Sequence, residues 1–143
     1  MHLVTDKITV PVGAGPDVAD ITHDLDAAIT RAGLQDGMLQ GSVLGSTGSI
    51  TTIEYERGVI EDLKDAITRL APPDRKYAHD LAWGDGNGHS HVQAALLGPS
   101  ICLPIRNGKL VRGTWQQVVV INHDLGPRER EIFLTLIGTK AEQ

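Results

Sequence analysis

The sequence is poor in cysteine, in aromatic residues and in long apolar runs. A single cysteine, Cys102, cannot form an intrachain disulfide, which fits a reducing compartment. Aromatic residues make up 3% of the chain, too few to build a stacking platform for single-stranded nucleic acid. No apolar run approaches the ~20 residues that a membrane span needs, so we expect a soluble protein.

An excess of positive charge and a targeting segment are also missing. The formal net charge of −5 argues against nucleic acid as a partner. The N-terminus has no basic region followed by an apolar region, so we expect no secretory signal. We therefore predict a cytoplasmic protein that binds neither nucleic acid nor a membrane.

Two helices are predicted from apolar periodicity and its stop signals. Residues 17–33 should form a helix that Asp17 caps and Gly33 ends. Residues 58–70 should form a second helix, which Pro72 and Pro73 terminate because proline cannot continue a helix.

The rest of the chain reads as short strands joined by tight turns. Asn107-Gly108 is a strong hairpin signal, residues 132–137 should be buried on both faces, and Cys102 should lie in the core. These features favour a single α+β domain over residues 1–143, mainly antiparallel and sandwich-like, with about seven strands and two main helices. The strands are predicted at residues 1–12, 38–44, 49–55, 100–105, 109–111, 115–122 and 131–137.

The stretch from Tyr77 to Gly98 concentrates titratable side chains on a glycine-rich loop in front of an apolar run. Such an arrangement is typical of functional sites. The titratable residues are His79, Asp80, Asp85, His89 and His91.

A short helix is predicted within this stretch. Ser90-x-x-Gln93 is a capping-box pattern, so Ser90 should cap a helix that Gly98 ends. His91 would then lie in the first turn, where the helix disfavours imidazolium and leaves a neutral ring that can ligate a metal or accept a proton. The same helix start attracts phosphate.

Three imidazoles with one carboxylate suit zinc or a similar divalent ion. We predict that His79, His89 and His91 bind the metal, with a carboxylate from Asp80, Asp85 or Glu54. The alternative is that one or two of these histidines only bond backbone groups of the loop.

Two further segments have a functional and a structural interpretation. The segment GSTGS at 45–49 could hold a phosphate through backbone N–H groups, or be a glycine hairpin turn. Trp115 is typical of a core or interface anchor. A basic set near the C-terminus should be mostly solvated, with one or two members that steer an anionic substrate: Arg106, Lys109, Arg112, Arg128 and Arg130.

Several segments, in the same order and at similar spacing, resemble the YjbQ-like family, also called the secondary thiamine-phosphate synthase family, and its archaeal-type branch in particular. The residues that carry the resemblance are GSTGSITTIEYE (45–56), YAHD (77–80), WGDGNGHSH (83–91), LLGPS (96–100), NGKLVRGTWQQ (107–117) and GPRERE (126–131). They cover almost the whole chain.

The resemblance implies a homotrimer with sites near subunit boundaries, and formation of thiamine phosphate from a pyrimidine pyrophosphate and a thiazole phosphate. Open sheet edges and apolar surface also favour a closed trimer. Many bacterial members have a histidine in the first motif where this chain has Ser46 and Thr47, and His89 could take its place. The family's polar signature falls on Glu54, His79, Asp85, Asn87, His91, Thr114, Trp115 and Gln116.

Three functions remain open at this stage. The first is a synthase that uses a divalent ion, zinc or magnesium, to neutralise a leaving pyrophosphate. The second is a zinc hydrolase of a small phosphorylated or heterocyclic substrate, and the third is a metal- or phosphate-binding module without turnover. We assign catalysis to His91, Glu54 and Asp85, and substrate binding to Ser46, Thr47, Asn87, Thr114, Trp115 and Gln116.

Overall fold

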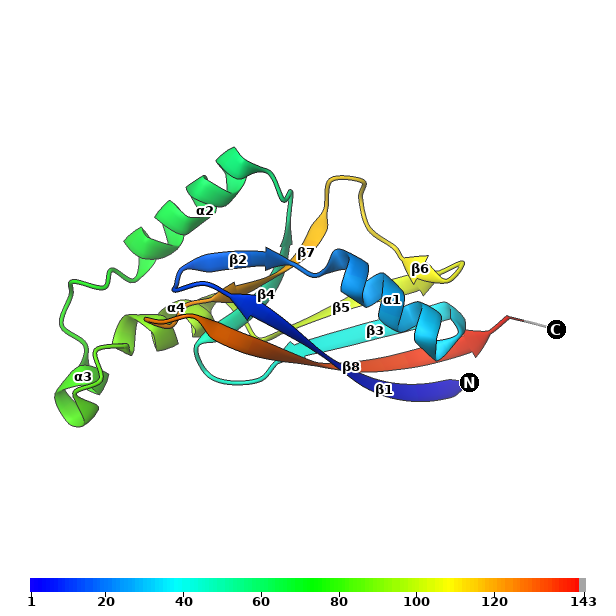
Figure 1. Cartoon of the computed structure of the whole chain (residues 1–143), viewed down its shortest axis with the longest axis horizontal. Coiled ribbons are helices and arrows are strands. Elements are labelled where there is room, and N and C mark those ends of the chain that lie inside the picture. The colour runs from blue at the N-terminus through cyan, green and yellow to red at the C-terminus, as the bar shows by residue number, and fades with distance from the viewer. Residues whose placement is uncertain (142–143) are drawn as a thin grey trace.

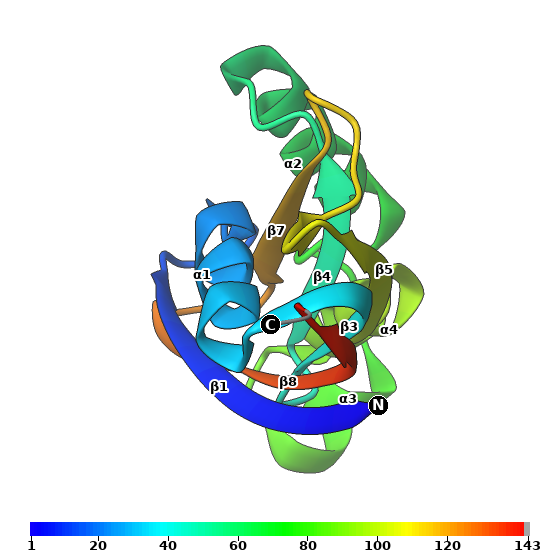
Figure 2. The ribbon, with the colours of Figure 1, turned by 90° about the vertical axis from the view of Figure 1, so that its right-hand side faces the viewer.

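Residues whose apolar side chains alternate along the chain form a curled, five-stranded antiparallel sheet in the computed structural model, which describes residues 1–141 (Figures 1 and 2). The longest strand, β8, pairs with β1 along one edge and with β3 along the other. In spatial order the strands are β1 (His2–Val12), β8 (Arg128–Lys140), β3 (Leu34–Val43), β5 (Ser100–Arg106) and β6 (Lys109–Leu110).

A smaller antiparallel sheet lies against the concave side of the first, in the order β2 (Asp17–Asp20), β7 (Gln117–Asn122), β4 (Gly48–Ile53). Its central strand is buried on both faces. Val118 and Val120 join the main core, whereas Val119 and Ile121 pack into a second cluster with Ile67. Strand β7 therefore separates two hydrophobic layers.

Four helices occur within residues 1–141, and none of them combines the length and apolarity that a bilayer crossing requires. Helix α1 fills the space between the two sheets, and α2 packs on the outer face of the smaller sheet through Ile67. The helices are α1 (Thr22–Ala32), α2 (Arg57–Leu70), α3 (Ala78–Trp83) and α4 (Gly88–Leu97).

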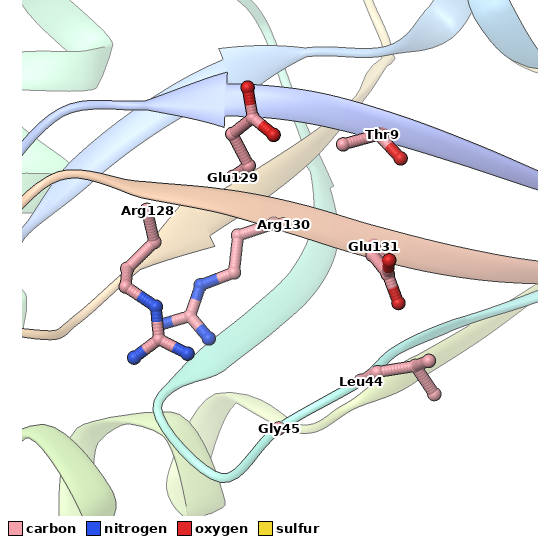
Figure 3. A pocket seen from close by; sticks show the side chains of 7 residues that line it. All are labelled: Thr9, Leu44, Gly45, Arg128, Glu129, Arg130 and Glu131. Carbon is pink, nitrogen blue, oxygen red and sulfur yellow. The ribbon is translucent and has the colours of Figure 1, made fainter.

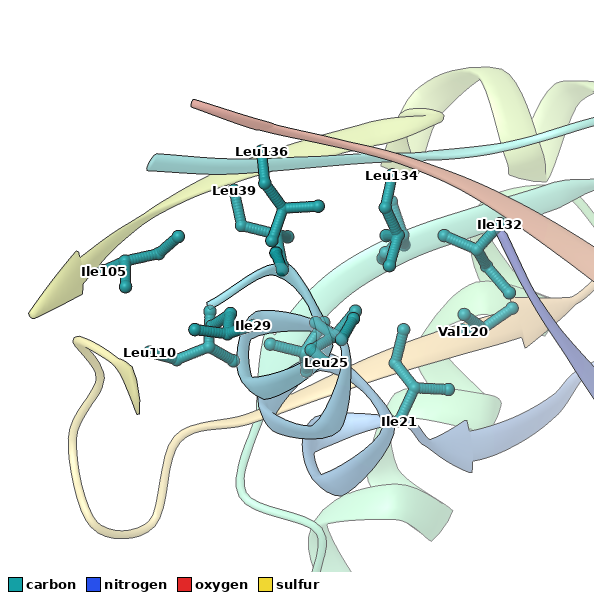
Figure 4. Packing of buried hydrophobic residues seen from close by; sticks show 14 of the residues in the cluster. Ile21, Leu25, Ile29, Leu39, Ile105, Leu110, Val120, Ile132, Leu134 and Leu136 are labelled. Carbon is teal, nitrogen blue, oxygen red and sulfur yellow. The ribbon is translucent and has the colours of Figure 1, made fainter. Parts of the chain in front are cut away.

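The main core forms where α1 meets the curled sheet (Figure 4). Leu25 and Ile29 recur at helical spacing on one face of α1 and are fully buried beneath Leu134 and Leu136 of β8. Burying a side chain of this size contributes about 1.5–3 kcal/mol. The fold class predicted from sequence, a mainly antiparallel α+β domain, is therefore confirmed, with eight strands and four helices among the described residues.

The predicted helix at 17–33 begins later than expected. Asp17 lies in β2, which pairs with β7, and α1 starts at Thr22 after Ile21. Thr22 makes this start favourable because its hydroxyl donates to Asp20 at 2.6 Å and accepts the Val118 N–H at 2.9 Å. The predicted end is confirmed, since Gly33 adopts a left-handed φ of 70°.

The segment at 45–49 is not a hairpin turn. Strands β3 and β4, which flank it, belong to different sheets and do not pair. The loop instead carries the chain from one sheet to the other. The hairpin at Asn107-Gly108 is confirmed, because both residues have positive φ and β5 pairs with β6.

Two expectations about burial are wrong. Residues 132–137 alternate, with Ile132, Leu134 and Leu136 buried and Phe133 exposed, so the strand buried on both faces is β7. Cys102 is exposed, since its position on β5 points away from the core.

Candidate functional site

Helices α3 and α4 bring two of the predicted site histidines together. The ring centroids of His79 and His91 lie 4.6 Å apart. The Asp85 carboxylate lies 3.0 Å from His79 Nε2, in the loop that joins the two helices. Both histidines are partly exposed, so this pair can be reached by a ligand.

Asn87 lies at the centre of the same group. One polar end of its amide is 3.1 Å from His79 Nε2 and 3.2 Å from the Asp85 carboxylate. The other end lies 3.5 Å from the carboxylate of Asp124, which follows β7. The amide thus connects the histidine loop to the end of the smaller sheet.

The start of α4 is fixed by Asp80 and Gly88. Asp80 Oδ1 accepts the Gly88 N–H at 2.9 Å and places a negative charge at the positive end of the helix. A Cβ on Gly88 would lie 2.5 Å from the Tyr77 side chain, so only glycine fits. Asp80 therefore already accepts one of the N–H groups that the predicted phosphate would use.

The predicted capping role of Ser90 is wrong. Helix α4 begins at Gly88, and Ser90 lies inside it, fully buried, with no hydrogen-bond partner for its hydroxyl among residues 1–141. Gln93 faces inward and donates to the Ala71 carbonyl at 3.0 Å. His91 still lies in the first turn, and Gly98 ends the helix as predicted.

His89 is buried and takes no part in the contact between the other two histidines. It is 6% exposed, and its ring packs toward Tyr77 at a centroid distance of 6.1 Å. Among residues 1–141, no group of three or more His, Cys, Asp or Glu side chains is arranged to hold a metal ion. A single chain therefore does not assemble the predicted set His79, His89 and His91 as ligands.

A cleft of about 320 Å³ lies between α4 and the loop at 45–48. His91 and the exposed Ser46 both line it, which brings two predicted site residues from distant parts of the sequence together. Thr47 is 5% exposed, and its hydroxyl donates to Asp124 at 3.2 Å and accepts from Arg130 at 2.7 Å. Thr47 therefore anchors the loop, and Ser46 is the hydroxyl that a ligand can reach.

The remaining predicted site residues lie at the other end of the smaller sheet. Glu54 follows β4, where Ile53 pairs with Gln117 at the start of β7. Gln116 donates to Thr52 at 3.2 Å, and Trp115 is 70% exposed, so it is no core residue. The length of β4 keeps this group, which also includes Thr114, roughly 17 Å from the histidine end.

Arg130 differs most from its expected environment. It was expected among the solvated basic residues, but it is 2% exposed and its Nη2 donates to Asn122 Oδ1 at 2.6 Å and to the Thr47 carbonyl at 2.9 Å. Its period-two spacing from the buried Ile132 and Leu134 was the signal that predicts an inward side chain. Arg128, two residues earlier, is half-exposed and pairs with Asp124 at 2.8 Å.

His123 is a second buried polar residue, and it lies outside the segments predicted to form the site. Its Nε2 lies 2.8 Å from Ser49 Oγ, and its Nδ1 lies 2.9 Å from Gln93 Oε1. The amide nitrogen of Gln93 donates to the Ala71 carbonyl, so the Gln93 oxygen faces His123 and accepts the proton on its Nδ1. The unprotonated Nε2 of His123 then accepts a hydrogen bond from the Ser49 hydroxyl. Burial, together with the charge of Arg130, lowers the pKa of His123 from 6.5 to about 4.

These features define a class of protein: a small antiparallel α+β domain with a histidine–aspartate pair beside a glycine-rich loop that joins its two sheets. The chain belongs to the UPF0047 protein YjbQ-like family, whose sequence model matches residues 6–139.

The chain aligns with archaeal and bacterial relatives over most of their length. A UPF0047 protein of Archaeoglobus fulgidus is 30% identical over 90% of this chain and 97% of its own length. The UPF0047 protein YjbQ of Salmonella typhimurium is 30% identical over 96% of this chain and 88% of its own. The crystal structure of a YbjQ-like protein of unknown function from Sulfolobus solfataricus superposes with a TM-score of 0.86 and 34% identity, over 96% of this chain and 100% of that one.

The lowered pKa of His123 predicts an acid-sensitive fold. Between pH 6.5 and about 4 the unfolded chain binds a proton at His123 that the folded protein does not. The contribution of neutral His123 to the free energy of unfolding is therefore complete above pH 6.5 and declines on acidification. The decline from this residue is at most about 1.4 kcal/mol per pH unit. We expect His123→Asn to be less stable than wild type at pH 7 and to show a shallower loss from pH 6.5 to 4.

The measurement is urea unfolding of both proteins at several pH values. Carboxylates with lowered pKa titrate in both proteins, so the difference between the two curves isolates His123. If the free energies of unfolding of the two proteins fell in parallel with pH, the lowered pKa would not belong to His123.

Proposed function

We propose that the protein is an enzyme that acts on a small phosphorylated molecule in the cleft between α4 and the loop at 45–48. The observation that supports it best is that His91, which lines this cleft, packs against His79, which in turn pairs with Asp85. Paired imidazoles with an orienting carboxylate are suited to proton transfer near neutral pH.

The loop at 45–48 is suited to hold a phosphate. Gly45 has a left-handed φ of 102°, and the loop is fixed from beneath by the bonds of Thr47 to Arg130 and Asp124. A rigid loop of small residues lets backbone N–H groups and the Ser46 hydroxyl approach phosphate oxygens closely. The ligand would lie within reach of His91 on the opposite wall of the cleft.

The family resemblance narrows the reaction to the joining of a pyrimidine pyrophosphate and a thiazole phosphate. The thiazole nitrogen would form a bond to the methylene carbon of the pyrimidine while the bond from that carbon to the pyrophosphate oxygen breaks. Negative charge grows on the leaving pyrophosphate. A proton on the His79–His91 pair, which the Asp85 carboxylate favours although the helix start disfavours a charged His91, would neutralise this charge or be donated to it. Asp85 would orient His79 and stabilise positive charge on the histidine pair.

A resident metal is not assigned to this site. The side chains of one chain do not supply three suitably placed ligands, because His89 is turned toward Tyr77. The predicted zinc or magnesium ion would need further ligands from a neighbouring subunit or from the substrate, so no step of the reaction is derived through it.

The decisive assay is pyrophosphate release in the presence of each precursor alone and of both together. We expect release that requires both precursors, and a reduction of about 10²–10⁴-fold in His91→Ala because a positioned proton donor contributes that much. The melting temperature of His91→Ala should change by only a few degrees, since the side chain is partly exposed.

His23→Ala is the matched control, because His23 is exposed on α1, away from the cleft. Hydrolysis of a single phosphate ester would favour the hydrolase, and tight binding without turnover would favour the binding module. Equal turnover in the two alanine variants would refute the role of His91.

We further propose that the protein is a homotrimer that buries the convex face of the five-stranded sheet. Leu3, Ile137, Met38 and Pro104 form one cross-strand row on β1, β8, β3 and β5. Leu3 is 67% exposed, Met38 52% and the nearby Phe133 42%, an unusual amount of apolar surface for one sheet face. Association through this face would remove these side chains from water.

Sedimentation should give a mass of about 46 kDa, three times the 15.3 kDa chain. Phe133→Glu should dissociate the assembly, because each subunit would bury an unpaired carboxylate on association. Leu70→Glu is the control, since Leu70 is 56% exposed at the end of α2 on the other side of the molecule. A wild-type protein that is monomeric at low micromolar concentration would contradict the proposed trimer.

A trimer would also explain why the predicted site residues form two groups. Glu54 and Trp115 lie too far from His91 within one chain to contact the same small ligand, so a complete site would combine groups from two subunits. The 45–48 loop and His91, by contrast, meet within one chain.

Mixed trimers test this arrangement. Trp115→Ala and His91→Ala should each be inactive alone, and co-refolded mixtures should regain part of the wild-type activity because some interfaces pair two intact halves. Activity that stays at the level of the separate variants, in mixtures shown to exchange subunits, would place the whole site in one chain.

A further inference from the structure

A second cleft lies on the other side of the 45–48 loop, between that loop and β8 (Figure 3). It has a volume of about 360 Å³ and shares Gly45 with the histidine cleft. Arg128 and Arg130 both line it, and their side chains extend from the same side of β8 toward the loop. Neither the histidine site nor its proposed chemistry uses these two guanidinium groups.

Arg130 is a buried cation without an anionic partner. It forms none of the ion pairs within residues 1–141. The acceptors of its hydrogen bonds are neutral, namely the Thr47 carbonyl, the Thr47 hydroxyl and Asn122 Oδ1, and all of them bond Nη2. Nε is buried without a partner. Buried charges are normally paired, so this guanidinium is well suited to an anion that completes the pairing.

The free edge of Arg130 faces the cleft. Nη1 lies beside Gly45, where a Cβ would stand 3.2 Å from it, and a Cβ on Gly48 would be 3.3 Å from the guanidinium carbon. The two glycines therefore let the loop pass close over the guanidinium. The N–H groups of Nη1 make none of the hydrogen bonds to Thr47 and Asn122, so they can bind a ligand. Burial lowers the pKa of Arg130, and the neighbouring charge of Arg128 lowers it further, while the charge of Asp124 raises it in part. An anion between the two arginines would relieve the remaining penalty.

The other charges at the cleft are compatible with an anion. Arg128 bonds Asp124 through Nη1 alone and is half-exposed, so the rest of its donor fork is available. Glu131 lies 3.4 Å from Lys7, which offsets its charge. Glu129 also lines the cleft, but its side chain leaves β8 on the side opposite to the two arginines (Figure 3).

We propose that the cleft formed by Gly45, Arg128 and Arg130 is a phosphoryl-binding subsite for a second phosphate of the substrate pair. Two arginine forks and a glycine backbone match the oxygens of a phosphoryl group better than those of a single planar carboxylate. This inference rests on the proposed function in one respect, namely that the substrates carry phosphate groups. The 45–48 loop then separates two anionic groups, one on the histidine side and one on the arginine side.

Equilibrium binding of inorganic phosphate, of glycerol 3-phosphate and of acetate, each in the presence of a chelator, tests the subsite. Arg128→Gln should weaken binding of both phosphates by about tenfold or more, the loss of one charge-assisted bond. Arg106→Gln is the matched control, because Arg106 is exposed on β5 and pairs only loosely with Asp36 at 3.7 Å. Acetate should bind at least about tenfold more weakly than phosphate.

A second readout needs no change at Arg130, whose replacement could unfold the protein. In wild type, the ¹⁵N resonance of Arg130 Nε should shift on addition of phosphate and stay unchanged on addition of acetate. An unshifted resonance under saturating phosphate, or equal affinity for acetate, would overturn the proposal. Binding of free phosphate without glycerol 3-phosphate would overturn the assignment to a substrate.

The histidine variant separates this proposal from the proposed function. His91→Ala should lose turnover and keep phosphate binding in the arginine cleft. Binding lost in His91→Ala but kept in Arg128→Gln would place the phosphate on the histidine side and overturn the subsite. Binding lost in Arg128→Gln, together with a wild type that turns over no precursor, would support the subsite and refute the synthase.

Discussion

The guanidinium of Arg130 connects the parts of this fold that form the site. It projects from β8 of the larger sheet and bonds both Asn122, at the end of β7 in the smaller sheet, and Thr47 in the loop between the sheets. Asn122 is fixed in turn, because its amide nitrogen donates to the carbonyls of Gly13 and Gly126. Without the guanidinium, the loop and the end of β7 would lose the partner that joins both of them to β8.

The position of the loop follows from this contact. Thr47 accepts from Arg130 through its carbonyl and its hydroxyl, and the same carbonyl accepts the His123 N–H at 2.9 Å. Leu44 at the other end of the loop donates to the Glu131 carbonyl at 3.0 Å. A loop held at both ends leaves Ser46 as its exposed side chain and presents it to His91 on one side, with the arginines on the other.

Burying a cation in this place carries a free-energy penalty of several kcal/mol. The penalty is partly offset by the hydrogen bonds to Thr47 and Asn122, and by keeping His123 neutral beside it. A polar centre of this kind contributes little to overall stability compared with Leu25, Ile29 and the other residues of the apolar core. Its main effect is on geometry. Each donor must meet a particular acceptor, so the network permits few other arrangements of the loop and the strands.

Local patterns in the sequence predicted what depends on local physics. Apolar spacing identified the helical turns around Leu25 and Ile29, Gly33 marked the end of α1, and Asn107-Gly108 marked a hairpin. The same patterns failed at Asp17 and Ser90, where a capping residue is equally compatible with a strand or a buried helical position. Local propensity cannot choose between these states when pairing with a distant strand decides the energy.

The sequence by itself determined the family, the α+β class and the concentration of His79, Asp85, Asn87 and His91 in one short stretch. Only the tertiary structure decided that His89 turns inward, that Glu54 and Trp115 lie at the far end of β4, and that Arg130 is buried under the loop. The reason is physical. Which side chains share a site depends on strand pairing and on the curl of the larger sheet, and both arise from contacts between residues far apart in the chain.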